Sequence, residues 1–354
     1  MGAECVLVVA ARGEYRKPAP ARGGCFVVRR DCQPDYLSKW VAGVSPDQPL
    51  HEAAHCILEA RLRAVAYWLP LAAEKSEEDV EYVHQLRVSA RRAVASVWIF
   101  SDLAAEDVVA QVRGKLHAMR RAADEARNLD VLLNDFLTYA SAESSRACQT
   151  LIADMRRRRR KADMPIAAVY AGSEADRFAE VVARLLEEVS ENRSIWATES
   201  FGRQAARYLQ PALKKYFKAS KANLTDSNAF HRLRIEGKKL RYTMEVLAVA
   251  FPASFRARLY PRLARLQDSM GVVNDHATAV TLYAQWLKEA PDADQRAYLD
   301  GMLLAEAKAS HDLRQAFLAT WTPRAMARMR RQFRRYTDPA HVLRGVRSAA
   351  RRPR

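Results

Sequence analysis

The sequence is poor in the features that stabilise small secreted domains, bind structural metal ions or span membranes. Its five cysteines, Cys5, Cys25, Cys32, Cys56 and Cys148, are an odd number and lack the paired spacing of metal ligands. Such cysteines are typical of free thiols in a reducing compartment. No stretch reaches the length of about eighteen apolar residues that a membrane-spanning helix needs, and the apolar run at 6–11 lacks the basic flank of a signal peptide. We therefore expect a cytoplasmic protein.

Glycine and proline are also scarce, at 12 and 14 of 354 residues, and no segment of residues 49–336 alternates with period two for long enough to indicate a β-sheet. Alanine, leucine, arginine and glutamate are abundant instead, which favours helices. Hydrophobic residues make up 49% of the chain, which excludes a disordered protein. The sequence therefore predicts an all-α fold.

Acidic residues are outnumbered, and the formal net charge is +17. Residues 324–354 alone hold eleven arginines and a single acid, Asp338, which leaves +7 for residues 1–323. The remaining basic character is thus confined to particular faces. This balance indicates a polyanionic partner such as a nucleic acid, an anionic membrane or polyphosphate.

One stretch occurs twice. The segment from His231 to Tyr242 repeats a segment that starts at His84, 147 positions earlier. The same offset holds without a gap from His84 to Asn128 and pairs Arg87 with Arg234, Arg91 with Lys238, Arg92 with Lys239 and Lys115 with Arg262. Farther along the chain, Lys161 and Lys308 also match at this offset. Such a constant offset predicts a duplicated unit.

The repeated residues share a direction on a helix. His231, Arg234, Lys238 and Arg241 fall within about 100° of one another, and leucines occupy the opposite side. Like charges three or four residues apart repel, so an ordinary solvated face mixes signs. The same cationic face in two copies therefore predicts a binding site for a polyanion.

The motifs also carry a family resemblance. The stretch from His231, His-Arg-Leu-Arg-Ile-x-x-Lys-Lys-Leu-Arg-Tyr, occurs with its shorter copy from His84 and with Leu-Gln-Asp-Ser-Met-Gly-Val-Val-Asn-Asp at 266–275. Together they resemble the CHAD domain, the conserved histidine α-helical domain, over roughly residues 49–320. The resemblance implies two tandem four-helix bundles related by a pseudo-two-fold, which enclose a basic central channel. It also implies binding of inorganic polyphosphate without known catalysis, and so association with polyphosphate or storage granules. The first copy departs from the family pattern at Ala123-Asp124, where a glycine usually ends the helix, so we expect a less regular turn there.

The predicted organisation has four parts. Residues 1–48 form an extension without a sustained helical pattern, residues 49–172 a first helical bundle, residues 173–322 a second bundle, and residues 323–354 a basic tail that starts as a helix. Proline and glycine near 164–172 indicate a linker at the junction. In the second half, helices are expected at 254–270 and 275–289, among others.

The predicted polyphosphate site combines both copies of the motif. Arginine presents a planar fork to phosphate oxygens, and lysine presents a mobile point charge. The candidates are His84, Arg87, Arg91, Arg92, His231, Arg234, Lys238, Lys239 and Arg241, with Lys115, Lys161, Arg262 and Lys308 as a second group. We expect no cofactor, no metal and no catalytic residue.

Two other functions remain open. A nucleic acid would use the same basic faces and compete with polyphosphate, although only Tyr242 offers a stacking aromatic on them. A zinc hydrolase would use His51-Glu52-Ala53-Ala54-His55, which matches the pattern that places two imidazoles on one zinc ion. That five-residue pattern is short enough to arise by chance.

Overall fold

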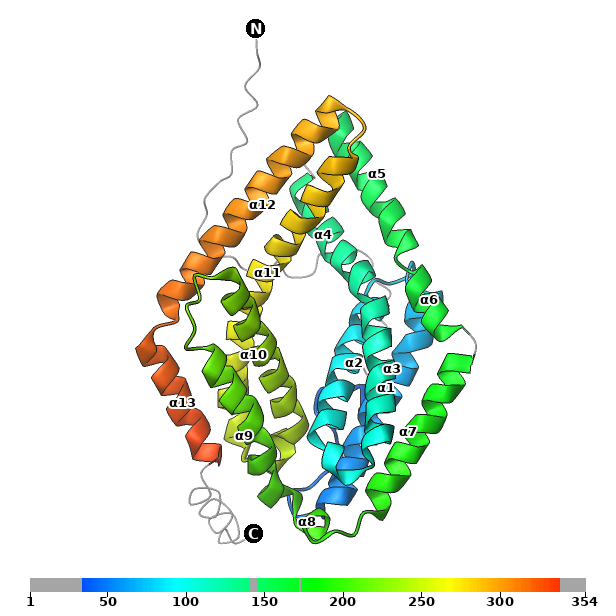
Figure 1. The fold of residues 1–354 in the computed structure, drawn as a ribbon, viewed down its shortest axis with the longest axis vertical. Coiled ribbons are helices and arrows are strands. Elements are labelled where there is room, and N and C mark those ends of the chain that lie inside the picture. The colour runs from blue at the N-terminus through cyan, green and yellow to red at the C-terminus, as the bar shows by residue number, and fades with distance from the viewer. Residues whose placement is uncertain (1–33, 141–144, 172, 338–354) are drawn as a thin grey trace. The chain divides into compact units, whose positions relative to one another are not determined.

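The computed structural model describes residues 34–140, 145–171 and 173–337. Its contacts divide the chain after Pro34, and every described helix belongs to the unit that begins at Asp35. This part of the chain is helical and contains no strand, only an isolated bridge between Pro49 and Ser200 (Figure 1). The prediction of an all-α fold is confirmed. None of the described helices is long and apolar enough to cross a membrane.

The first half of the described chain consists of seven α-helices and two short 3-10 helices. These are η2 (Asp35–Leu37), α1 (Leu50–Glu74), α2 (Glu81–Ile99), η3 (Ser101–Leu103), α3 (Glu106–Ala122), α4 (Asp124–Ala140), α5 (Arg146–Lys161), α6 (Met164–Tyr170) and α7 (Ser173–Glu191). Helix α1 packs on α2, α2 packs on α3, and α7 covers α1 and α3. Helix α7 lies beyond the predicted boundary at residue 172, yet it packs with the helices before that boundary.

The second half consists of the remaining helices of the described chain. It contains α8 (Ile195–Thr198), α9 (Phe201–Ala219), α10 (Ser227–Leu247), η4 (Ala248–Ala250), the π-helix η5 (Phe255–Leu259), α11 (Tyr260–Glu289), α12 (Ala293–Thr320) and α13 (Pro323–Thr337). Helix α9 packs on α10, α10 on α11, α11 on α12, and α13 on α9. At the offset of 147, α10 coincides with α2 to within one residue at each end.

Besides the contacts of α1 with α8 and α9, two regions join the two halves. Helix α10 packs on α2, and farther along the chain α4 packs on α11 while α5 packs on α12 (Figure 1). In the second region, the ring of Phe136 meets that of Tyr298, and Arg158 donates to Glu289 at 2.6 Å while its guanidinium lies 5.0 Å from the ring of Trp286. These contacts join α4 and α5 of the first half to α11 and α12 of the second half.

The segment before α1 is also tied to the helices. Arg61 of α1 is 1% exposed, and its guanidinium donates to the carbonyls of Ser38 at 2.7 Å and Lys39 at 2.6 Å. The ammonium group of Lys39 lies 4.0 Å from the ring centre of Tyr260, at the start of α11. Residues 38–40 therefore link α1 to the second half. The remainder of the predicted extension, residues 1–33, lies outside the described residues.

At three places the structure differs from what the sequence predicts. Residues 164–170, predicted as a linker, form the short helix α6, which starts with Pro165 in its first turn, where a missing N–H costs nothing. Residues 260–289 form one continuous helix instead of two, because buried side chains such as Met270 and Val273 on both sides of Gly271 hold it in place. In the first copy, α3 ends at Ala122 and α4 begins at Asp124, so the expected irregular turn is a one-residue break. Residues 338–354 of the basic tail lie outside the described residues.

The close approach of α10 to α11 depends on one glycine. A Cβ atom added to Gly237 would lie 1.9 Å from Nε2 and 2.8 Å from Cδ of Gln267, which is 3% exposed, and 3.2 Å from Cε2 of Tyr216. A larger side chain at this position must therefore displace buried neighbours. Gly271, by contrast, has nothing within 4 Å of an added Cβ.

We predict that Gly237→Leu lowers the free energy of unfolding by on the order of 3 kcal/mol, because overpacking a buried contact strains its neighbours. The matched substitution Gly271→Ala should raise it by up to about 1 kcal/mol, because alanine has the higher helix propensity. Urea unfolding followed by circular dichroism measures both. Equal effects of the two substitutions would contradict the proposed contact.

Candidate functional site

Helices α2 and α10 present the repeated cations because their other sides are buried. On α10, the apolar residues Leu233, Leu240, Met244 and Leu247 are fully buried in the core. The N-terminus of α10 is capped by Asp226, whose carboxylate accepts from the backbone N–H of Asn228 at 2.9 Å. The helix is therefore fixed in register, and its cationic face has to point toward the neighbouring α2.

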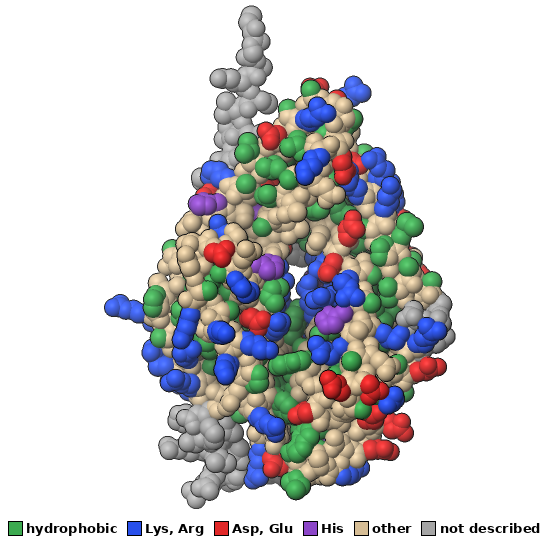
Figure 2. Space-filling view, viewed as in Figure 1, with side chains coloured by type: hydrophobic (Ala, Val, Ile, Leu, Met, Phe, Trp, Pro, Cys, Tyr) green, Lys and Arg blue, Asp and Glu red, His purple; other side chains and the backbone are tan. Residues whose placement is uncertain are grey.

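A cavity of about 830 Å³ lies where these faces meet. Its walls include seven of the nine primary candidates, namely His84, Arg87, Arg91, His231, Arg234, Lys238 and Lys239. Figure 2 shows an opening in the molecular surface with histidine, lysine and arginine side chains on both sides of it. Both copies of the motif thus contribute to one space.

Several basic residues of the cavity were not predicted from the sequence. They come from three further helices and are Arg113, His117 and Arg120 of α3, Arg127 of α4 and Lys215 of α9. The three α3 residues are spaced by four and three positions, so they share one helix face, and that spacing was a usable signal. Nine lysine and arginine side chains line the cavity against three acids, Asp124, Glu236 and Asp275, so its charge is strongly positive.

The acids compensate only part of this charge. Arg87 forms an ion pair with Asp124 at 2.8 Å, and Lys239 forms one with Glu236 at 2.6 Å. Burial, together with the neighbouring Arg91, lowers the pKa of Arg87 to about 10. Burial is also the main reason that the pKa of His117 is lowered, and three arginines on the same helix add to the effect. The cavity therefore disfavours positive charge as long as it holds no anion.

Lys238 is affected most strongly. Burial and the nearby Arg234 and Arg91 lower its pKa to about 6, against a weaker opposing effect of Asp275. At pH 7 the amine is therefore mostly neutral in the empty cavity. An anion placed next to it would raise the pKa again and cause the amine to take up a proton.

The family follows from a comparison with known proteins. Residues 56–284 match the family model described as the CHAD domain, which is well over half of the chain. The chain belongs to the CHAD domain family. No curated protein matches the sequence.

Two solved structures share its fold. The crystal structure of the CHAD domain from the plant Ricinus communis is 22% identical, with a TM-score of 0.57, over 82% of this chain and 93% of the other. PptA from Streptomyces chartreusis is 18% identical, also with a TM-score of 0.57, over 77% of this chain and 100% of the other.

Two primary candidates of this CHAD domain do not line the cavity. The Nε of Arg92 donates to the carboxylate of Glu245 at 2.8 Å, and the hydroxyl of Tyr260 donates to the same carboxylate at 2.5 Å. Arg241 lies 3.6 Å from Asp268 and stacks on the ring of Tyr242. Arg92 follows Arg91 by one position and hence points about 100° away from it, toward α10 and not into the cavity.

The second group of candidates lies outside the cavity lining as well. Lys161 and Arg262 are exposed, Lys115 is half-buried on α3, and Lys308 pairs with Asp312 at 2.8 Å. In the arginine run of α5, Arg159 is buried and donates to Asp130 and Asp163. The run thus includes at least one structural residue, while Arg156 and Arg160 are exposed.

The zinc pattern on α1 is used for packing. His51 is 8% exposed, and its Nδ1 lies 3.0 Å from the carbonyl oxygen of Ala197 on α8. Among the described residues, no group of three or more histidine, cysteine or acidic side chains is arranged to hold a metal ion. This imidazole therefore joins α1 to α8.

We predict that Lys238→Met stabilises the protein at pH 7 by about 1 kcal/mol, or roughly 2 °C in Tm. A lysine with a pKa of about 6 in the folded protein binds fewer protons than in the unfolded chain, where its pKa is ordinary. Between these two pKa values it opposes folding, and stability rises with pH. The gain from Lys238→Met should therefore shrink toward pH 10, as thermal unfolding at pH 7 and pH 10 would measure. An equal gain at both pH values would contradict the lowered pKa.

Proposed function

We propose that the cavity binds inorganic polyphosphate and that this protein does so without catalysing a reaction on it. The single observation that carries the proposal is the convergence of nine lysine and arginine side chains from α2, α3, α4, α9 and α10 on one space with only three acids. Polyphosphate carries about one negative charge per phosphate, so a chain of it meets such a wall with matching charge along its length. Membership of the CHAD family is consistent with this function.

The proposed contact residues are refined by the geometry of the cavity. They are His84, Arg87, Arg91, His231, Arg234, Lys238 and Lys239, together with Arg113, His117, Arg120, Arg127 and Lys215. Arg92 and Arg241 act indirectly, because their guanidinium groups hold Glu245 and Asp268 outside the cavity. Lys115, Lys161, Arg262 and Lys308 contribute only through long-range charge.

A single-stranded nucleic acid fits the cavity less well. Recognition of single strands relies on aromatic rings on which bases stack. The aromatic rings of the lining are Trp98 and Tyr242, and Tyr242 is only 5% exposed. The face of Trp98 is approached by the ammonium of Lys215, at 5.5 Å. Neither ring is free to stack on a base. A nucleic acid would therefore bind through its phosphates alone, and polyphosphate makes the same phosphate contacts without bases that have to be accommodated.

We predict that Arg91→Glu combined with Lys238→Glu reduces the affinity for long-chain polyphosphate by at least about a hundredfold, while the circular dichroism spectrum stays helical. Each substitution removes a phosphate contact and adds repulsion. The control is Lys115→Glu with Lys308→Glu, which makes the same two Lys/Arg-to-Glu changes in formal charge outside the cavity lining. Titration calorimetry across a salt series, together with an assay for released phosphate, measures both affinity and turnover. Equal losses in the two double variants would refute the cavity as the site, and steady phosphate release by the unmodified protein would refute the non-catalytic function.

A second prediction concerns pH. If polyphosphate raises the pKa of Lys238 from about 6, the complex holds more protons than the free protein, and affinity falls as pH rises from 7 to 9. Calorimetry in two buffers of different ionisation enthalpy should show proton uptake at pH 7.5. In Lys238→Arg, which stays charged throughout, the uptake should be reduced and the affinity less dependent on pH over this range. The same uptake in this variant would assign the proton to another group.

A further inference from the structure

A second basic surface lies on the other side of α9, where α13 packs against it. The core of this contact is apolar, and its floor consists of the buried side chains of Leu213, Phe217 and Phe333. Above the floor is an open groove of about 450 Å³. This is enough space for a few side chains of leucine size.

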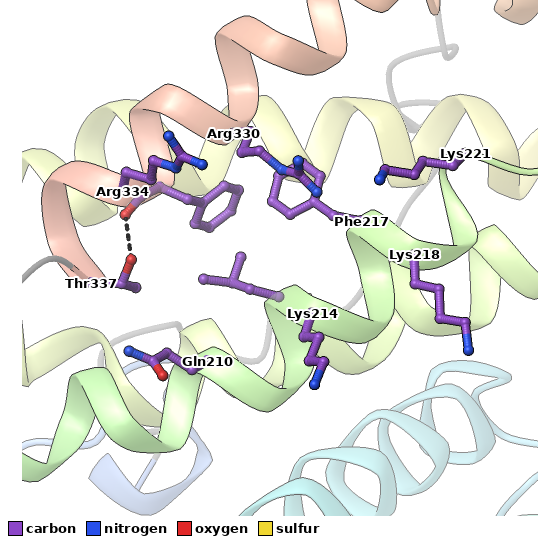
Figure 3. Close-up of a pocket in the computed structure, with 10 residues that line it drawn as sticks. Gln210, Lys214, Phe217, Lys218, Lys221, Arg330, Arg334 and Thr337 are labelled. Atoms are coloured by element: carbon purple, nitrogen blue, oxygen red, sulfur yellow. Dashed lines mark hydrogen bonds between the residues drawn. The ribbon is translucent and has the colours of Figure 1, made fainter.

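Cations border the groove on both helices. Lys214 and Lys218 lie on α9 at a spacing of four, Lys221 follows in the turn after α9, and Arg330 and Arg334 lie on α13 at a spacing of four. Figure 3 shows Arg330 and Arg334 extending from α13, and Lys214 and Lys218 extending from α9 on the other side of the floor. No acidic side chain is part of the lining.

These cations form no ion pairs within the described part of the chain. None of the five has a carboxylate within 4.0 Å among the described residues. Only Arg330 has a further contact, with its guanidinium 5.0 Å from the ring centre of Phe217. The groove therefore offers a row of unpaired positive charges on each side of an apolar floor.

The shape and chemistry of the groove distinguish between anionic partners. Polyphosphate has no apolar surface with which to fill a floor of leucine and phenylalanine. An anionic membrane would need apolar side chains that protrude, but Phe217 is 5% and Phe333 1% exposed, so both lie below the rims. A third possibility, an amphipathic helix, presents an apolar ridge with charges beside it at spacings of three and four residues. This is the same spacing as that of the rim cations.

We propose that the groove between α9 and α13 docks an acidic amphipathic helix of a partner protein. The apolar ridge of the partner helix would lie on Leu213, Phe217 and Phe333, and its flanking glutamate or aspartate residues would pair with Lys214 and Lys218 on one side and Arg330 and Arg334 on the other. The arrangement adds a third helix to the pair α9 and α13, as in helix-in-groove recognition. The sequence that continues beyond Thr337 is itself basic and does not complement the rim.

The test uses a synthetic helical peptide of about twenty residues with leucines along one face and glutamates on both flanks, labelled for fluorescence anisotropy. We expect a micromolar Kd. A second peptide of the same composition, in which the leucines are dispersed around the helix, should bind at least tenfold more weakly. Equal binding of the two peptides would overturn the proposal, because it would show that charge alone suffices.

The variants locate the binding surface. Lys214→Glu with Lys218→Glu should weaken peptide binding at least tenfold. The matched control is Arg203→Glu with Arg207→Glu, which makes the same charge change at the same spacing on exposed positions of α9 outside the groove, and it should weaken binding less than twofold. Similar losses in both variants, or a loss only in Arg91→Glu with Lys238→Glu, would place the peptide elsewhere and overturn the proposal.

Vesicles that contain phosphatidylserine complete the experiment. Vesicle binding that Lys214→Glu with Lys218→Glu abolishes, without binding of the peptide, would assign the groove to a membrane surface and overturn the proposal. The affinity for polyphosphate is measured in the same variants. We expect Lys214→Glu with Lys218→Glu to lose no more polyphosphate affinity than the Arg203→Glu, Arg207→Glu control. The docking proposal can therefore fail while polyphosphate binding in the cavity stands, and polyphosphate binding can fail while the docking proposal stands.

Discussion

The repulsion between cations that rigid helices hold close together is the constraint on which the site depends. Helices α2 and α10 are fixed by apolar residues on their far sides, so Arg87, Arg91 and Arg234 cannot move apart as free side chains would. The protein limits this repulsion in two ways: Asp124 pairs with Arg87, and Lys238 loses its proton. The remaining cations of the cavity still outnumber its acids, and an anionic polymer can supply the missing negative charge from outside.

The cations of α2 and α10 have different surroundings on the cavity side and on the side where the two helices meet. Toward the cavity, the positive charges exceed the negative ones. On the side where α2 meets α10 directly, the buried carboxylate of Glu245 accepts from both Arg92 and Tyr260. A buried carboxylate requires such partners, since an unpaired one is costly to desolvate. One set of charges thus holds the helices together, and the other remains open to a ligand.

The difference between these two sets marks what could be predicted from the sequence. The constant offset between His84 and His231 predicted both the helices and the seven cavity residues. The same cationic face in two helices is best explained by a ligand that both helices contact. Helical periodicity cannot reveal which neighbour a face meets, so Arg92, only about 100° from Arg91, was assigned to the same site. Arg113 and Arg120 were missed for another reason: although they share one face of α3, neither has a basic counterpart at the offset of 147, and the packing of α3 on α2 brings them to the cavity. The continuous helix α11 depends likewise on tertiary contacts that outweigh the low helix propensity of Gly271.

The guanidinium of Arg61 ties residues that precede the family match to the first long helix. The family match starts at residue 56, but the two carbonyls that accept from Arg61 belong to Ser38 and Lys39. A chain cut at the edge of the match would retain this almost fully buried cation and lose both acceptors, at a cost of several kcal/mol. The compact unit that contains the described helices accordingly begins at Asp35, and this arginine of the first long helix is one of the residues that hold its N-terminal stretch.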